Sequence, residues 1–191
     1  MSIELIIAVV VILVLIFYLI SIYNKLVSLK NRVDNGWAQI DVQLQRRYDL
    51  IPNLVETAKG YMKHEKETLK MVIDARNAAN EAAKTASGDP SDQNAIKDLQ
   101  ESEQKLQGAM MNFQALAEGY PDLKANTNML ALQEELATTE NKVGFSRQAF
   151  NDAVMQYNTG IEVFPNSLIA NQFKFTQATE WQIEDQEARK N

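Results

Sequence analysis

The chain lacks cysteine and has one histidine, four prolines and seven glycines in 191 residues. Without cysteine it can form neither a disulfide framework nor a thiolate metal site. A single histidine cannot supply the two Glu-x-x-His motifs of a di-iron bundle or the second histidine of a zinc-protease helix. So few glycines and prolines leave too little turn chemistry for an all-β chain. These shortages favour an all-α protein and predict that it carries no metal or cofactor.

The motifs of common enzymes and of nucleic-acid-binding proteins are also missing. No glycine-rich phosphate loop is present, and no serine has a candidate base beside it. The net charge is −6 and no long basic stretch occurs, which argues against nucleic acid as a partner. We therefore expect a protein that is not an enzyme and that has neither a nucleic-acid partner nor a small-molecule substrate.

One apolar run differs from the rest of the chain. It extends from Leu5 to Ile20 without a charge, a glycine or a proline. With its flanks it reaches the roughly 20 residues, at about 1.5 Å each, that cross a hydrocarbon core of about 30 Å. A cleaved signal peptide would show a basic start and a small-residue cleavage site, and both are missing. Tyr18 and Tyr23 fit an interfacial aromatic belt. We predict a retained transmembrane anchor over residues 1–23.

The basic residues beside the anchor predict its orientation. Lys25, Lys30 and Arg32 follow the apolar run, whereas no lysine or arginine precedes it. Basic residues near a span stay on the cytoplasmic side, so the N-terminus is expected outside and the remaining chain in the cytoplasm. The same side chains are expected to meet anionic head groups, which makes membrane lipid a partner.

Residues 24–164 are expected to form four long helices. The anchor runs into a first helix up to Leu44, and a second is expected to start at Asp49, with Pro52 in its first turn. Apolar stripes of helical period mark a third helix over 96–117 and a fourth over 129–164. Short connections imply antiparallel neighbours. We predict an all-α fold in which the anchor continues into an elongated antiparallel up-down four-helix bundle with coiled-coil-like stripes.

Polar side chains in this bundle allow two interpretations. Structural ion pairs are one, with Arg46, Arg47 and Asp49 near one another in sequence and Glu134 or Glu140 as partners across the bundle. A contact between subunits is the other, because an interior glycine costs about 1 kcal/mol unless a second backbone approaches it closely. The candidate interface is one flank of the fourth helix: Glu140, Gly144, Arg147, Asn151 and Asn158.

A tail, residues 165–191, follows the bundle. Its aromatic side chains Phe173, Phe175 and Trp181 precede an acidic, helix-prone end over 180–187. These rings either fold back and cap the open end of the bundle or contact the membrane or a partner. Both interpretations stay open, because up-down topology returns the fourth helix to the bilayer side.

Several unrelated motifs, in order along almost the whole chain, are more specific than any heptad. They include Gly36-Trp37-Ala38-Gln39-Ile40-Asp41, Arg46-Arg47-Tyr48-Asp49-Leu50-Ile51-Pro52-Asn53-Leu54, Tyr120-Pro121-Asp122-Leu123 and Leu132-Gln133-Glu134-Glu135-Leu136. In these motifs the chain resembles the LemA family of bacterial membrane proteins. The resemblance implies an N-terminal membrane helix, a cytoplasmic-type four-helix bundle and a bacterial inner membrane. It implies no reaction.

Two functions fit these features. The first is a scaffold that self-assembles into a homo-oligomer and organises or shapes the membrane. The alternative is a monomeric, membrane-tethered adaptor or envelope-stress sensor that presents the bundle to a protein client. The anchor has no Gly-x-x-x-Gly face, so assembly must come mainly from the soluble helices. Apolar residues off the main stripes favour the scaffold: Val42, Ile73, Met111 and Leu130.

Overall fold

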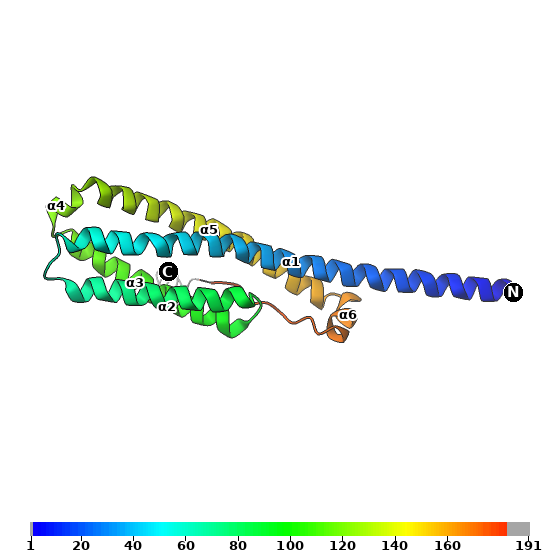
Figure 1. The fold of residues 1–191 in the computed structure, drawn as a ribbon. Coiled ribbons are helices and arrows are strands. Elements are labelled where there is room, and N and C mark those ends of the chain that lie inside the picture. The colour runs from blue at the N-terminus through cyan, green and yellow to red at the C-terminus, as the bar shows by residue number, and fades with distance from the viewer. Residues whose placement is uncertain (1, 183–191) are drawn as a thin grey trace, which may run out of the picture.

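The computed structural model describes residues 2–182 and shows an all-α fold (Figure 1). An N-terminal apolar helix continues into an elongated antiparallel four-helix bundle, as the sequence predicts. The helices are α1 (Ile3–Lys59), α2 (Lys66–Gly88), α3 (Gln93–Ala117), α4 (Pro121–Lys124), α5 (Thr127–Glu162) and α6 (Asn166–Gln172).

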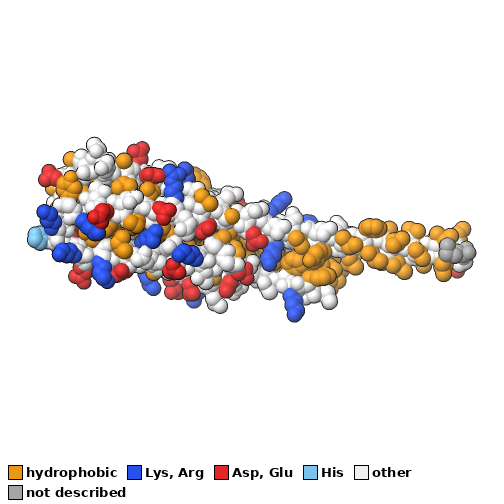
Figure 2. Space-filling model, viewed as in Figure 1, with side chains coloured by type: hydrophobic (Ala, Val, Ile, Leu, Met, Phe, Trp, Pro, Cys, Tyr) orange, Lys and Arg blue, Asp and Glu red, His pale blue; other side chains and the backbone are white. Residues whose placement is uncertain are grey.

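The first third of α1 stands clear of the bundle. Its most apolar window has a mean hydropathy of 3.4 and is only 6% buried, so the helix is long and apolar enough to span a membrane and is not a core helix. Figure 2 shows hydrophobic side chains along this thin end of the molecule. The whole of α1 has 57 residues and is therefore about 86 Å long at about 1.5 Å per residue.

The bundle alternates in direction along the chain. Beyond its apolar N-terminal third α1 leads away from that segment, α2 returns, α3 leads away again and α5 comes back toward it (Figure 1). Packing joins α1 to both α5 and α2, and α2 to α3. Between α3 and α5 lies a cleft of about 210 Å³, floored by α1. The up-down topology is thus confirmed, with one side of the bundle less closely packed than the others.

The predicted apolar stripes form the core. On α1 the residues Leu26, Val33, Trp37, Ile40 and Leu44 are buried, at successive spacings of seven, four, three and four. The stripes of α3 and α5 supply the facing side chains: Leu99, Leu106, Phe113, Val143, Phe150, Val154 and Tyr157. Each helix therefore buries the face that its period predicts.

The expected break between the first two bundle helices is wrong. Helix α1 continues through Pro52 to Lys59, and the chain turns at Gly60–Glu65, where the only histidine, His64, is exposed. Proline has no N–H, so the carbonyl of Tyr48, four residues earlier, loses its helical donor. The Nε of Arg76 on α2 donates to that carbonyl oxygen at 2.8 Å. This tertiary hydrogen bond compensates for the proline and keeps α1 continuous.

Candidate functional site

A buried acid on α3 is the centre of the polar contacts inside the bundle. Glu103 accepts hydrogen bonds from the guanidinium of Arg47 and from the hydroxyl of Tyr48, both on α1. Burial raises the pKa of Tyr48 to about 12 and lowers the pKa of Arg47. The tyrosine hydroxyl therefore stays protonated and donates at neutral pH. Enclosed in this way, the three groups join α3 to α1 inside the bundle.

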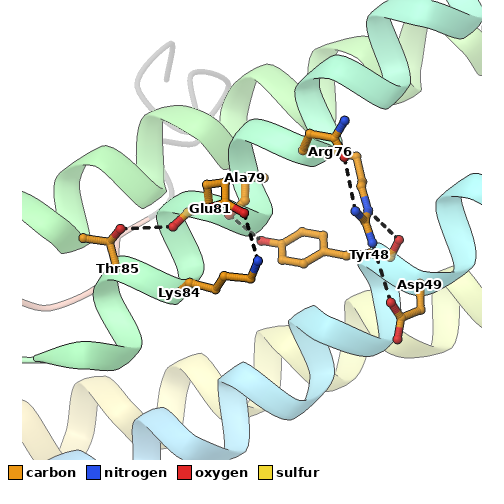
Figure 3. Close-up of polar contacts among 8 residues, drawn as sticks. Tyr48, Asp49, Arg76, Ala79, Glu81, Lys84 and Thr85 are labelled. Atoms are coloured by element: carbon orange, nitrogen blue, oxygen red, sulfur yellow. Dashed lines mark hydrogen bonds and ion pairs between the residues drawn. The ribbon is translucent and has the colours of Figure 1, made fainter.

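Further polar contacts surround this centre. Figure 3 shows Tyr48 directed at the carbonyl of Ala79 on α2, and Arg76 reaching back to the Tyr48 carbonyl and to Asp49. The Arg76–Asp49 pair is looser, at 3.6 Å, and Asp49 is largely exposed. Tyr48 thus reaches from α1 to the backbone of α2, and Arg76 reaches from α2 to the backbone of α1.

The structure gives the predicted ion-pair residues other acidic partners. Arg46 pairs with Glu135 at 2.6 Å, not with the expected Glu134. One residue along a helix is a rotation of about 100°, which leaves Glu134 exposed and turns Glu135 toward α1. Glu140 lines the cleft near Arg47, and its charge partly opposes the lowering of the Arg47 pKa by burial, but Arg47 bonds Glu103 instead.

The α3–α5 cleft has a mixed lining. Leu106, Met110 and Leu136 contribute apolar surface, and Arg47 and Glu140 contribute charge. Among the residues that the structure describes, no group of three or more histidines, aspartates and glutamates is placed to hold a metal ion. The cleft therefore combines apolar surface with two side chains of opposite charge.

The chain after α6 runs back along the bundle in an extended conformation (Figure 1). Asn158 on α5 donates to the Ala178 carbonyl at 2.8 Å and accepts from the Ala178 amide at 2.9 Å. Asn151 makes the same pair of bonds to Trp181, at 3.1 and 2.8 Å. Seven helical residues span about 10.5 Å, and three extended residues span about 10 Å. The distance between the Asn151 and Asn158 side chains along α5 therefore matches the distance between Ala178 and Trp181 along the extended tail.

Trp181 secures the far end of this segment. Its ring is buried and lies 6.1 Å from the ring of Trp37, which also packs on Phe150 at 5.6 Å. The Nε1 of Trp37 donates to Ser87 on α2 at 3.0 Å. The backbone of Glu180 accepts from Gln100 on α3. Residues 178–181 thus lie between α5 and α3, and Trp37 connects this tail to three helices.

These contacts revise the predictions for the flank of α5 and for the tail. Asn151 and Asn158, expected at a subunit interface, hold the tail of the same chain. Trp181 folds back onto the bundle, whereas Phe173 and Phe175 lie beside Tyr23, at the end of the predicted anchor. The acidic end beyond Gln182 lies outside the described residues.

The subunit contact at Gly144 on α5 stays a prediction, because the structure describes a single chain. A Cβ at Gly144 would meet no atom within 4 Å, so no other described segment approaches this residue closely. The close approaches of α1 and α5 occur elsewhere. A Cβ at Gly36 would lie 3.2 Å from the Phe150 Cα, and one at Gly160 would lie 2.5 Å from Leu29 Cδ1. Arg147 is half-buried on the same flank, and burial lowers its pKa.

Three residues of this polar network had no assigned role in the sequence. Glu103 had a signal, because it occupies an apolar heptad position between Leu99 and Leu106, where a buried acid requires a partner. Arg76 has the same signal, because it lies on the apolar stripe with Leu69 and Val72, whereas Ser87 has none.

We expect Asn151→Ala or Asn158→Ala to loosen the tail without unfolding the bundle. Each change removes two hydrogen bonds, each with a net value of about 0.5–1.5 kcal/mol. The amides of residues 176–182 should then exchange hydrogen about 10- to 100-fold faster, as measured by mass spectrometry. Asn128→Ala, an exposed asparagine on the same helix, is the matched control. Unchanged exchange in both variants would show that the tail is held by other contacts.

Comparison with known proteins gives two matches. The model of the LemA family matches residues 36–191, which include both the polar centre and the tail segment. A curated relative, Protein LemA of Metamycoplasma hominis, is 25% identical over 157 residues, covering 81% of this chain and 67% of that protein. The family match begins after the apolar N-terminal segment of α1, so the bundle and the tail carry it. Neither description names a reaction.

Proposed function

This chain belongs to the LemA family, and we propose that it is a non-enzymatic, membrane-anchored helical scaffold. In this proposal the bundles assemble into a homo-oligomer that organises or shapes the bacterial inner membrane. The observation that carries it is the continuity of α1, which joins the apolar N-terminal segment to the bundle without a break. Contacts between bundles would therefore set the spacing and tilt of the anchors.

Exposed apolar side chains on α1 and α5, Val42, Phe145 and Met155, supply a surface for such contacts, which we call the α1–α5 face. Val42 and Phe145 are 62% and 74% exposed, and Met155 on α5 is also exposed. Gly36 lies against Phe150 and Arg46 pairs with Glu135, so antiparallel packing places Val42 level with Phe145. Exposed apolar groups of this kind mark protein contact surfaces. Met111 and Leu130 are exposed as predicted, whereas Ile73 packs partly against the core.

The alternative function rests on a different surface. A monomeric adaptor or stress sensor would use the α3–α5 cleft, whose rim carries Met110 and Met111. Methionine side chains adapt to varied apolar partners, which suits a protein client. The mass of the detergent-solubilised protein separates the two functions: a scaffold exceeds the monomer mass of 21.6 kDa several-fold, and an adaptor does not.

The orientation in the proposal is N-terminus outside and bundle in the cytoplasm, and a cysteine placed on the bundle tests it. The native chain has no cysteine, and Met111 is exposed on α3, so Met111→Cys provides a unique thiol. It should react in intact spheroplasts only with a membrane-permeant maleimide, because Lys25, Lys30 and Arg32 keep their side of the anchor inside. Ser2→Cys, at the other end of the anchor, should also react with an impermeant maleimide. Impermeant labelling at position 111 but not at position 2 would place the bundle outside.

A further inference from the structure

An apolar corner forms where α5 ends and α6 begins, at the anchor side of the bundle. Val163, Phe164, Leu168 and Phe173 are 45–81% exposed there, and Figure 2 shows their surroundings as a hydrophobic patch at the base of the thin end. Two contacts hold the corner against the rest of the bundle. The side-chain amide of Asn166 donates to the Gly160 carbonyl at 3.0 Å, and Ala170 is buried against the bundle. The exposed side chains therefore project from a segment that its contacts with the bundle hold in place.

The corner lies level with the end of the anchor. The Tyr23 ring is 4.8 Å from the Phe173 ring and 5.9 Å from the Phe175 ring. Gly160 packs beside Leu26 and Leu29 of α1. Because α5 runs antiparallel to α1, Phe164, four residues or about 6 Å further on, reaches the level of Ile22 and Tyr23.

The anchor length fixes where the bilayer surface falls. Residues 3–23 span about 31 Å at about 1.5 Å per residue, which matches the hydrocarbon core. Tyr23 then occupies the interface, where aromatic side chains of membrane proteins concentrate. The exposed lysines Lys25 and Lys174 lie next to this level in sequence, where ammonium groups meet head-group phosphates.

We propose that the corner formed by residues 163–173 is a second membrane contact, inserted at the boundary between head groups and acyl chains of the leaflet through which the anchor exits. This inference rests on the part of the proposed function in which α1 spans the membrane, and it does not depend on oligomerisation. We name lipid as the partner because the corner lies level with the end of the anchor, where the bilayer surface falls. Two contact points hold the bundle at a fixed tilt, and the corner occupies area in one leaflet only.

Fluorophores at single cysteines in the cysteine-free full-length chain test the proposal. Leu168→Cys reports on the corner, Ile12→Cys on the anchor and Met111→Cys on the distal bundle. Each is labelled with an environment-sensitive dye and reconstituted into phosphatidylcholine–phosphatidylglycerol vesicles that carry nitroxide lipids. The nitroxide sits either near the head group or deep in the acyl chain. Circular dichroism of each variant checks that the fold is kept.

We expect the dye at position 168 to be quenched at least twofold more by the shallow nitroxide than by the deep one. The dye at position 12 should respond mainly to the deep nitroxide, and the dye at position 111 to neither. Quenching at 12 without quenching at 168 overturns the membrane contact and leaves the anchor intact. Blue-shifted but unquenched emission at 168 also overturns it, because another protein or a second copy then covers the corner. An unquenched dye at 12 overturns the spanning anchor itself.

Discussion

Glu103→Ala is expected to lower the free energy of unfolding of the bundle by about 3–5 kcal/mol. The substitution leaves the buried guanidinium of Arg47 without the carboxylate that it bonds, and the Tyr48 hydroxyl with only the more distant Ala79 carbonyl, at 3.4 Å, as acceptor. A buried charge that loses its partner costs far more than an exposed ion pair contributes. Chemical denaturation of the detergent-solubilised protein, followed by circular dichroism, measures the change.

Two further variants separate this effect from a general loss of side chains on α3. Glu101→Ala removes an exposed acid two residues away and should change stability by less than about 0.5 kcal/mol. Replacing both partners, Arg47→Met with Glu103→Leu, should recover most of the loss, because an apolar pair needs no counter-charge. If Glu103→Ala is as mild as Glu101→Ala, the ion pair does not lie inside the bundle.

Periodicity accounts for the parts of the fold that the sequence predicted. The apolar run has no counterpart elsewhere in the chain, and stripes such as Leu99, Leu106 and Phe113 give both the helix and its buried face. These features depend only on local spacing. The long apolar N-terminal helix and the buried faces followed from them, whereas the all-α class followed from the few glycines and prolines and the up-down order from the short connections.

Features that depend on contacts between helices were not predictable from spacing. Pro52 predicted a helix start, because nothing in the sequence pairs the Tyr48 carbonyl with Arg76. The prediction named Glu134 as a partner, whereas Arg46 pairs with its neighbour Glu135. Both are acids in one helical turn, and only packing decides which of them faces Arg46.

The flank of α5 shows which part of a contact a sequence pattern can predict. Asn151 and Asn158 were assigned to a candidate subunit interface, and each makes two hydrogen bonds within the chain. The partner is the extended backbone near Ala178 and Trp181, which has no helical period to reveal it. A pattern on one helix therefore identified the surface but not its occupant.

Phe145→Asp is expected to convert the proposed homo-oligomer into a monomer while leaving the bundle folded. The ring is 74% exposed and contributes little to the core, so its loss should hardly change helical content. In an assembly through the α1–α5 face, an aspartate there would be desolvated without a partner and would block association. Light scattering in mild detergent gives the mass, and circular dichroism gives the helical content, of the variant and the parent.

Variants on other surfaces show which face is used. Met111→Asp changes a residue of similar exposure, 63%, on α3 and should leave the mass unchanged. Gly144→Leu has open space for its side chain, and Arg147→Glu reverses a charge on the same flank, so both should keep the fold. Loss of the oligomer in these two variants, but not in Phe145→Asp, would move the contact to the flank beside the tail. A parent protein that already runs near 21.6 kDa would remove the scaffold altogether and leave the adaptor, with its client in the α3–α5 cleft, as the function to test.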